Sequence, residues 1–366
     1  MALSRISLTD FRCFSQVEVD IAIEGTTALT GPNGAGKSSV VEGVSWLADQ
    51  RSFRGSQRDL LVRTGADQAM VIADLVVGGR KIGIRALLPR TRNATLEINS
   101  NRVRNTSSVS EVLRAVTFSP DDLRLVQGGP ADRRSWLDGI LSARSLRAAE
   151  RIRTVERALR QRAALLKQIA RRGGGISPEV GSTLDVWDER LAGCGSLLAE
   201  DREDLVGRLS PLVDASYRDL SGSSSEVSLL YRRSWEGDLQ EALVRGRQDD
   251  VVRQATGVGP HRDELVVLLD GRTARSQASQ GEQRCIALGL KVASHAVLSE
   301  PGREPPVLLL DDVFSELDHY RATALVAQLP RNQTILTTAG DLPAGMEIGK
   351  VVELTADHSL AAPGIL

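Results

Sequence analysis

The segment Gly31-Pro32-Asn33-Gly34-Ala35-Gly36-Lys37-Ser38 fits the pattern G-x-x-x-x-G-K-[ST] at every fixed position. It follows the strand-like residues 26–30 and precedes residues 38–49, in which apolar side chains recur with helical spacing. Glycines let such a loop curl until successive backbone N–H groups point at phosphate oxygens, and the following helix adds the positive end of its dipole. A glycine turn that fits by chance is the alternative, but the strand and helix on either side favour a nucleotide site.

The residues of this loop have expected roles toward ATP and Mg²⁺. Lys37 is expected to bridge the β- and γ-phosphates and to support catalysis there, and the Ser38 hydroxyl is expected to ligate the metal. The candidate nucleotide contacts in this segment are Gly31, Pro32, Asn33, Gly34, Ala35, Gly36, Lys37, Ser38 and Ser39.

An apolar run, residues 307–310, ends in two carboxylates, Asp311 and Asp312. By itself such a run is more often a strand followed by a turn, but together with a phosphate loop it indicates a Walker B site. Asp311 is expected to hold Mg²⁺ through water, and Asp312 to act as the catalytic base. Many ABC-type ATPases carry a glutamate at the second position. Because aspartate is one methylene shorter, we expect slow hydrolysis.

The hexapeptide Ser279-Gln280-Gly281-Glu282-Gln283-Arg284 resembles the signature of ABC-type ATPases in the S-G-G-E form of SMC-type heads, with Gln280 in place of the first glycine. Ser279 and Glu282 also have capping-box spacing, so a plain helix start is the alternative. The resemblance implies that Ser279, Gly281 and Glu282 contact the γ-phosphate bound by an opposite subunit. ATP would then hold a head-to-head homodimer together.

Other positions carry weaker signals. Gln127 stands where a Q-loop glutamine would contact Mg²⁺ or the attacking water, and an exposed loop glutamine is an equal alternative. The switch histidine of transporter ATPases is missing from residues 334–339. Thr338 or a neighbour is a candidate γ-phosphate sensor, although a threonine at a strand end needs no function. His261 and Arg262 look exposed and have no assigned chemistry, and a capped turn accounts for them.

The order of elements predicts two α/β lobes that bracket a helical insertion. We expect an N-terminal lobe with the phosphate loop (1–130), a helical arm (131–254) and a C-terminal lobe with signature, Walker B site and D-loop (255–366). Between residues 131 and 220, helical periodicity broken by a glycine-rich stretch predicts two long antiparallel helices with a flexible tip. The expected fold class is α/β: an ABC-type, SMC-like P-loop ATPase head of two lobes with an inserted helical arm.

Composition limits the function classes. The 46 Lys and Arg residues nearly balance the 47 Asp and Glu residues, so a nucleic-acid surface must come from local clusters of arginine. Aromatic residues make up 3%, which argues against a base-stacking reader of single strands. Three widely spaced cysteines disfavour disulfide and metal chemistry. No apolar stretch is long enough to span a bilayer, so we expect a cytoplasmic protein without a membrane partner.

Six blocks of sequence together resemble the RecF family, nearly from end to end. They are residues 8–14 (LTDFRCF), 52–54 with 58–61 (SFR and RDLL), 118–123 (FSPDDL), 131–138 (ADRRSWLD), 259–265 (GPHRDEL) and 311–318 (DDVFSELD). The resemblance implies an ABC-type head that dimerises with ATP, a weak DNA-stimulated ATPase activity, and a nucleotide contact at Arg12. It also implies ATP-dependent binding of single- and double-stranded DNA at gaps, where the protein helps RecO and RecR to load RecA in recombinational repair.

Arginine clusters are the direct sequence support for DNA binding, although a solvated face is the likelier account of any one cluster alone. They are Arg51, Arg54, Arg58, Arg90, Arg92, Arg102 and Arg104. Two rival functions are the nucleotide-binding subunit of a membrane transporter and a structural SMC-like protein. The missing switch histidine and the long insertion argue against the first, and the shortness of the helical segment argues against the second. We expect slow hydrolysis to reset the dimer.

Overall fold

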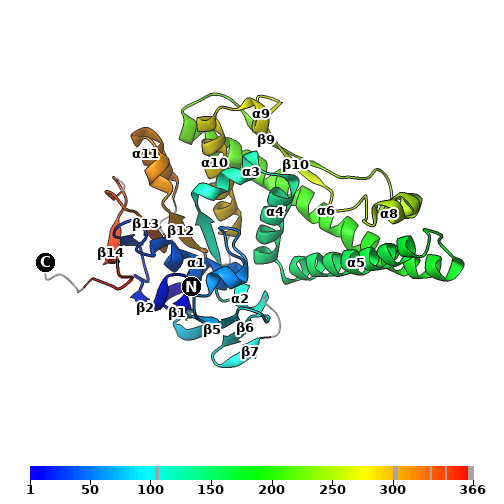
Figure 1. Ribbon diagram of the computed structural model, residues 1–366. Helices are drawn as coiled ribbons and strands as arrows, with labels where there is room; N and C mark the ends of the chain where they lie inside the picture. Colours follow the sequence, from blue (N-terminus) through cyan, green and yellow to red (C-terminus); the bar gives the residue numbers. More distant parts are fainter. Residues whose placement is uncertain (104–106, 300–303, 330–331, 343, 362–366) are drawn as a thin grey trace. The chain divides into compact units, whose positions relative to one another are not determined.

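The computed structural model describes residues 1–103, 107–299, 304–329, 332–342 and 344–361. The chain divides into two compact units (Figure 1). The first unit comprises Met1–Leu123, Ala215–Ser224 and Arg284–Leu366, and the second unit comprises Arg124–Asp214 and Ser225–Gln283. Arg104, one of the arginines considered for DNA contact, lies outside the described residues.

A parallel sheet in the first unit carries the phosphate loop and the acidic pair at the ends of its strands. Within the described chain it consists of β3 (Thr26–Thr30), β8 (Ala115–Phe118), β12 (Val307–Asp311), β13 (Thr334–Thr337) and β14 (Ile348–Glu353). The strand order is β14-β3-β13-β12-β8. β12 is a central strand that pairs with β13 on one side and β8 on the other, and all of its residues are buried. Burial on both faces of a parallel sheet explains its continuous apolar sequence.

The other sheet described in the first unit is antiparallel. In the order β2-β1-β4-β5-β6-β7 it contains β1 (Ala2–Phe11), β2 (Phe14–Asp20), β4 (Gln68–Val77), β5 (Arg80–Pro89), β6 (Thr95–Ile98) and β7 (Asn101–Val103). Gly78 and Gly79, with φ of 54° and 77°, connect β4 to β5. Two successive positive φ angles suit a tight hairpin turn between these strands.

The helices of the first unit follow the phosphate loop and the parallel strands. They are α1 (Lys37–Asp49), α2 (Ser107–Ser110) and α11 (His319–Gln328), with the 3₁₀ turns η1 (Arg58–Leu61), η2 (Pro120–Leu123) and η3 (Val313–Glu316). Helix α10 (Gln280–Leu298) begins in the second unit and continues into the first.

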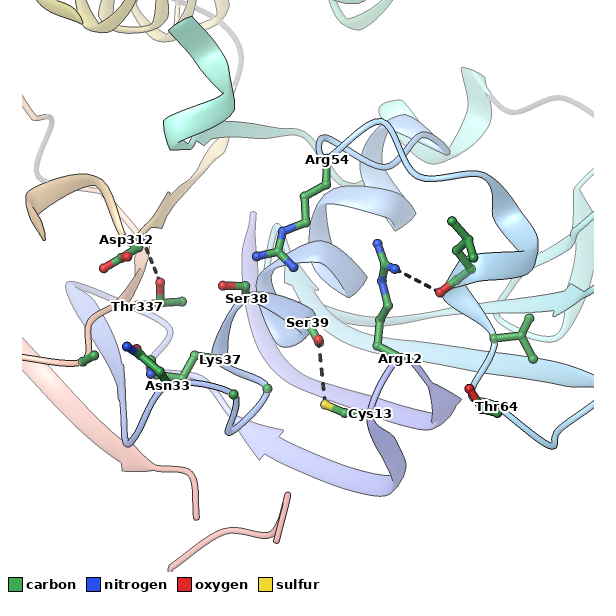
Figure 2. Close-up of a pocket in the computed structure, with 15 residues that line it drawn as sticks. Arg12, Cys13, Asn33, Lys37, Ser38, Ser39, Arg54, Thr64, Asp312 and Thr337 are labelled. Carbon is green, nitrogen blue, oxygen red and sulfur yellow. Dashed lines mark hydrogen bonds between the residues drawn. The ribbon is translucent and has the colours of Figure 1, made fainter. Parts of the chain in front are cut away.

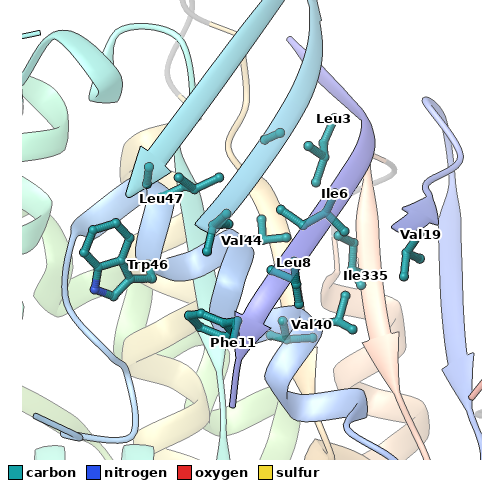
Figure 3. Close-up of a cluster of buried hydrophobic side chains, with 14 of the residues drawn as sticks. Leu3, Ile6, Leu8, Phe11, Val19, Val40, Val44, Trp46, Leu47 and Ile335 are labelled. Carbon is teal, nitrogen blue, oxygen red and sulfur yellow. The ribbon is translucent and has the colours of Figure 1, made fainter. Parts of the chain in front are cut away.

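A single apolar core joins α1 to both sheets of the first unit (Figure 3). Leu8 of β1, Val44 of α1 and Ile335 of β13 belong to it and are fully buried. Because α1 begins at Lys37, this packing fixes the end of the phosphate loop on a rigid scaffold.

The second unit is mainly helical. Its elements are α3 (Arg124–Gln127), α4 (Pro130–Arg144), α5 (Leu146–Arg171), α6 (Pro178–Ser221), β9 (Val227–Arg232), α7 (Leu239–Arg245), α8 (Arg247–Arg253), β10 (Glu264–Leu269), β11 (Arg272–Thr273) and α9 (Ala274–Gln277). Strands β11, β10 and β9 form a small antiparallel sheet. The last residues of α6, from Ala215, are counted with the first unit.

The long helices α5 and α6 run antiparallel, as the ion pairs Arg162–Asp188 and Arg151–Asp201 show by their opposed register. The expectation of one continuous helix from residue 131 to the glycine-rich tip was wrong, because α4 ends at Arg144 and α5 is a separate helix. Ser145 has an extended backbone (φ −149°, ψ 122°), and its side chain accepts a hydrogen bond from Ala148 N. Serine favours this N-cap position, so the chain starts a new helix there.

The compact units do not follow the expected lobe boundaries at residues 130/131 and 254/255. Residues 255–283 belong to the second unit, and residues 215–224 belong to the first. The division into two lobes and an arm, with the boundaries expected from the sequence, therefore stays a prediction. No helix in the described part of the chain is both long and apolar enough to cross a membrane.

Candidate nucleotide-binding site

Close packing around the loop between β3 and α1 explains its glycines. Gly31 has φ 132°, and a Cβ atom there would lie 2.1 Å from Leu354 O. Gly36 caps α1 with φ 99°, and a Cβ atom there would lie 2.4 Å from Phe14 Cζ. Any other residue at these positions would meet both backbone strain and a collision, so the loop's path depends on both glycines.

Lys37 is the first residue of α1 and is buried. Its Nζ donates hydrogen bonds to Gly31 O at 2.7 Å and to Pro32 O at 2.9 Å. Burial lowers the pKa of Lys37, while the charges of Asp312 and Asp311 act in the opposite direction. The loop carbonyls therefore hold the ammonium group close to the acidic strand end.

The acidic pair is fixed from the neighbouring strand by Thr337. Thr337 Oγ1 donates a hydrogen bond to Asp311 Oδ1 at 3.0 Å and accepts one from Asp312 N at 2.9 Å. Asp312 has φ 53°, a left-handed conformation that is uncommon outside glycine. Thr337 thus stabilises the turn that follows β12. The sequence analysis named Thr338 or a neighbour as a candidate γ-phosphate sensor. The Thr338 hydroxyl forms hydrogen bonds with the backbone of Gly340.

Asp311 lies behind the pocket at 3% exposure. Burial raises the pKa of Asp311, while a hydrogen bond from Ser38, the charge of Arg54 and the Thr337 hydrogen bond lower it. A carboxylate that is buried next to a phosphate-loop serine fits the expected metal-side position, because a divalent cation would stabilise its charged form.

These groups surround one pocket of about 460 Å³, which is within the usual size range of small-molecule sites (Figure 2). It is lined by Arg12, Cys13, Asn33, Gly34, Gly36, Lys37, Ser38, Ser39, Arg54, Leu60, Val62, Thr64, Asp312, Thr337 and Ala339. Gly31 and Pro32 stand behind this lining as acceptors for Lys37, and Ala35 is buried in the core.

Arg54 is a pocket residue to which the sequence assigned no role in the nucleotide site, although it lies in an arginine cluster and in a segment that resembles the RecF family. Its Nη2 lies 3.8 Å from Asp311 Oδ2, and its guanidinium lies over the Phe53 ring at 6.0 Å from the centroid. Figure 2 shows this guanidinium pointing toward Ser38. Arg54 lies in an irregular segment after α1, so neither motif spacing nor periodicity could have placed it in the site.

Arg12 lines the pocket, but its hydrogen bonds go to the protein. Nε and Nη2 donate to the two carboxylate oxygens of Glu42 at 2.7 and 2.6 Å, and Nη1 donates to Leu60 O at 3.0 Å. Ser56 also accepts from Nη2 at 2.6 Å. Glu42 is fully buried, so Arg12 neutralises its charge and ties α1 to the segment that carries Arg54.

Gln127 and the first five residues of the signature-like hexapeptide, 279–283, lie in the second unit, and its last residue, Arg284, is counted with the first. Ser279 N donates to Glu282 Oε2 at 2.7 Å and Glu282 N donates to Ser279 Oγ at 3.3 Å, which is a reciprocal capping box. Gln127 Nε2 donates to Gln283 Oε1 at 2.7 Å. Gln127 is thus hydrogen-bonded to α10, the helix that begins with the signature. The sequence did not predict this pair, because the two glutamines lie far apart along the chain.

His261 and Arg262 are held in a turn of the second unit. His261 Nε2 lies 3.0 Å from Thr256 O, and Arg262 Nε donates to the same oxygen at 3.1 Å. Burial lowers the pKa of His261 to about 4, so the ring is neutral at physiological pH. The expectation that His261 is exposed was wrong, and the capped-turn interpretation describes both residues.

Comparison with known proteins shows which family this chain is similar to. The model for the RecF/RecN/SMC N terminal domain matches residues 2–340. "DNA replication and repair protein RecF" of Streptomyces avermitilis is 39% identical over 351 residues, which cover 93% of this chain and 93% of that protein. The protein of the same name from Kineococcus radiotolerans is 38% identical and covers 94% of this chain and 95% of its own length.

Solved structures agree with the sequence comparison. A structure described as "the recombination mediator protein RecF-ATPrS in RecFOR pathway" superposes with a TM-score of 0.86 at 26% identity, covering 99% of this chain and 98% of that one. An Smc head domain from Pyrococcus furiosus, with a TM-score of 0.57 at 16% identity over 98% of this chain and 96% of its own, shares the fold. The expected SMC-like ATPase head is confirmed, and the chain belongs to the RecF family of the RecF/RecN/SMC class.

Proposed function

We propose that this chain is an ATP-dependent DNA-binding protein of recombinational repair and a weak, DNA-stimulated ATPase. The observation that carries the proposal is the convergence of Lys37, Asp312 and Thr337 on one pocket in a chain of the RecF family. A relative of that family is named as a protein of DNA replication and repair, and a solved relative carries an ATP analogue in its description. We assign the protein to the cytoplasm.

ATP and Mg²⁺ fit the residues of this pocket. The loop from Gly31 to Ser39 supplies backbone N–H groups for phosphate oxygens, and Lys37 supplies a charge beside them. Ser38 and the buried Asp311 offer oxygen ligands of the kind that Mg²⁺ prefers. When bound, the metal neutralises negative charge on the phosphates. Gln127, through its amide oxygen, is proposed as a further contact to the metal or to water.

Asp312 is proposed as the general base. It lines the pocket at the end of β12, so its carboxylate can accept a proton from a water molecule that attacks the γ-phosphate. Lys37 and Arg54 meanwhile offset negative charge near the same pocket. Aspartate reaches one methylene less far than glutamate, which supports slow turnover.

Replacing Thr337 by valine is expected to lower the kcat of ATP hydrolysis about tenfold while changing ATP binding little. The substitution removes the hydroxyl that bridges Asp311 and Asp312 N, and an unsatisfied buried polar group costs about 1–3 kcal/mol. Thr337→Ser keeps the hydroxyl and should behave as wild type. Steady-state kinetics that separate kcat from KM decide this, and an equal loss in both variants would rule out the hydrogen bond as the cause.

The signature supports an ATP-dependent homodimer. The capping box leaves the N-terminus of α10 ordered, with Ser279, Gly281 and Glu282 at its start. The positive end of a helix attracts a phosphate, so we propose that this end meets ATP held by a second copy. We further propose that the protein binds DNA at gaps and cooperates with RecO and RecR in loading RecA. Hydrolysis of ATP then resets the dimer. Membership of the RecF family argues against the alternative function as a transporter subunit.

The experiment that tests the proposal is fluorescence-anisotropy binding to a gapped duplex, with and without ATP and Mg²⁺, at two salt concentrations. We expect binding that requires ATP and weakens with salt, because contacts with DNA phosphates release counterions. We expect it to fall at least about tenfold in Lys37→Ala, because this variant loses the lysine of the ATP pocket. Lys81→Ala, an exposed lysine of β5, is the matched control. ATP-driven dimers without DNA affinity would keep the ATPase and refute the DNA-binding function.

A further inference from the structure

A second cavity, of about 630 Å³, lies in the second unit and shares no lining residue with the nucleotide pocket. It forms where α4 ends and α5 begins, with α6 supplying another wall. Its charged lining consists of Arg144, Arg147, Arg151, Arg208, Asp201 and Asp204. We call this site the arginine cavity.

The arginine cavity carries an excess of positive charge. Four guanidinium groups face two carboxylates, which leaves a formal charge of +2 (4 − 2). Arg151 Nη1 donates to Asp201 Oδ2 at 2.5 Å, so one carboxylate is engaged with one arginine. Burial lowers the pKa of Arg144, and burial together with the charge of Arg144 lowers that of Arg208. Arg144 and Arg208 repel each other, and an anion between them would relieve that repulsion.

The chemistry of the lining points to phosphate. The planar guanidinium fork of arginine matches the oxygens of a phosphate group and binds them with paired hydrogen bonds. Ser145 also lines the cavity, as the N-cap of the 26-residue helix α5, so the positive end of a long helix faces the same space. The lining contains no aromatic side chain, so the cavity lacks a platform for stacking a base.

Helix α5 also carries positive charge outside the cavity. Between Leu146 and Arg171 it holds eight Lys or Arg residues against two Glu, a net charge of +6 (8 − 2), in a chain whose total is −1. The spacing i, i+4, i+7, i+14, i+18 places five of its cations on one helix face. They are Arg153, Arg157, Arg160, Lys167 and Arg171, of which the last four are exposed. At 3.6 residues per turn this row lies on roughly the opposite side of α5 from the cavity residues Arg147 and Arg151, so it does not continue the cavity and adds only to the general positive charge of the helix.

We propose that the arginine cavity binds the phosphodiester backbone of DNA. The inference rests on the DNA-binding function proposed above and gives it a surface in the second unit. The cavity would anchor one or two phosphates without reading the bases, because arginine–phosphate contacts carry no sequence information. Asp204, exposed at the same site, weakens this attraction.

The test uses the full-length protein, saturated with ATP and Mg²⁺, and a gapped duplex in an anisotropy titration across salt concentrations. The double variant Arg147→Gln/Arg208→Gln should bind about tenfold more weakly, and its slope of log affinity against log salt should be shallower by about 2. Asp204→Asn should bind about threefold more tightly, because it removes a repulsive charge. A gain of affinity cannot arise from misfolding. Arg245→Gln, an exposed arginine of α7, is the control and should match wild type.

The outcomes separate this inference from the function on which it rests. Wild-type protein that binds the gapped duplex while both cavity variants bind equally well would overturn the cavity and leave the DNA function intact. Wild-type protein without DNA affinity would overturn both. Pyrophosphate, titrated at constant ionic strength into ATP-saturated protein, distinguishes a free-phosphate site. Loss of pyrophosphate binding in the double variant with unchanged DNA binding would also overturn the proposal.

Discussion

Replacement of Arg162 by methionine is expected to lower the free energy of unfolding by about 3–5 kcal/mol, the usual cost of removing one partner from a buried ion pair. Arg162 is fully buried on α5. Its Nε donates to Asp188 Oδ1 and its Nη1 to Asp250 Oδ2, both at 2.6 Å. Asp188 would keep its bond from Arg247 Nε at 2.8 Å. Asp250 would keep only Gly257 N, at 2.8 Å, among the partners described for it.

The measurement is urea unfolding combined with hydrogen exchange of peptides from α5, α6 and α8. Arg160→Met is the matched control on the same helix, since Arg160 is exposed and pairs with Glu156 at 3.8 Å. An exposed pair of this kind contributes roughly 0–1 kcal/mol. Adding Asp250→Asn to Arg162→Met should restore part of the loss, because it removes the unpaired charge. A loss below about 1 kcal/mol in Arg162→Met would show that the cluster does not stabilise the second unit.

Replacement of Asp312 by asparagine is expected to reduce ATP hydrolysis about 10²–10³-fold, within the range attributed to a positioned general base. An amide cannot take up the proton, while its size and its backbone bond to Thr337 Oγ1 are retained. ATP affinity should change little, because Lys37 and the loop remain. Single-turnover kinetics with a separate measurement of ATP affinity check both statements.

Asp341→Asn is the control for the same chemical change at an exposed position outside the pocket. It should leave turnover at the wild-type rate. Undiminished hydrolysis in Asp312→Asn would exclude Asp312 as the base and move the role to another group near the pocket. Loss of ATP binding together with hydrolysis would instead assign Asp312 to ground-state binding of the nucleotide.

The candidate site could be predicted from sequence where its chemistry is local. The phosphate loop depends on glycines and a lysine at fixed separations, and the structure shows the collisions that make Gly31 and Gly36 necessary. The capping box of Ser279 and Glu282 is likewise a three-residue relation, and both its hydrogen bonds are present. The hairpin at Gly78-Gly79 follows from turn geometry alone.

Some elements of the fold could not be predicted from the sequence, because their hydrophobic patterns were short or mixed. Strand β8 has four residues, and β14 lies at the edge of the described parallel sheet beside β3, with half of its residues exposed. Neither forms a clear alternation over a useful length. Ser145 divides the first arm segment into α4 and α5, which helical periodicity alone does not reveal.

The sequence by itself predicted the phosphate loop, the acidic strand end and the family, because each rests on residue types at fixed spacing along the chain. Only the tertiary structure decided which distant side chains complete them. In the structure, Thr337 holds the turn at Asp311 and Asp312, and Arg54 lines the pocket. Arg12 donates hydrogen bonds to the buried Glu42. These pairings join strands and loops far apart in sequence. Their partners are chosen by burial and by the need to satisfy every buried charge, which no local pattern encodes.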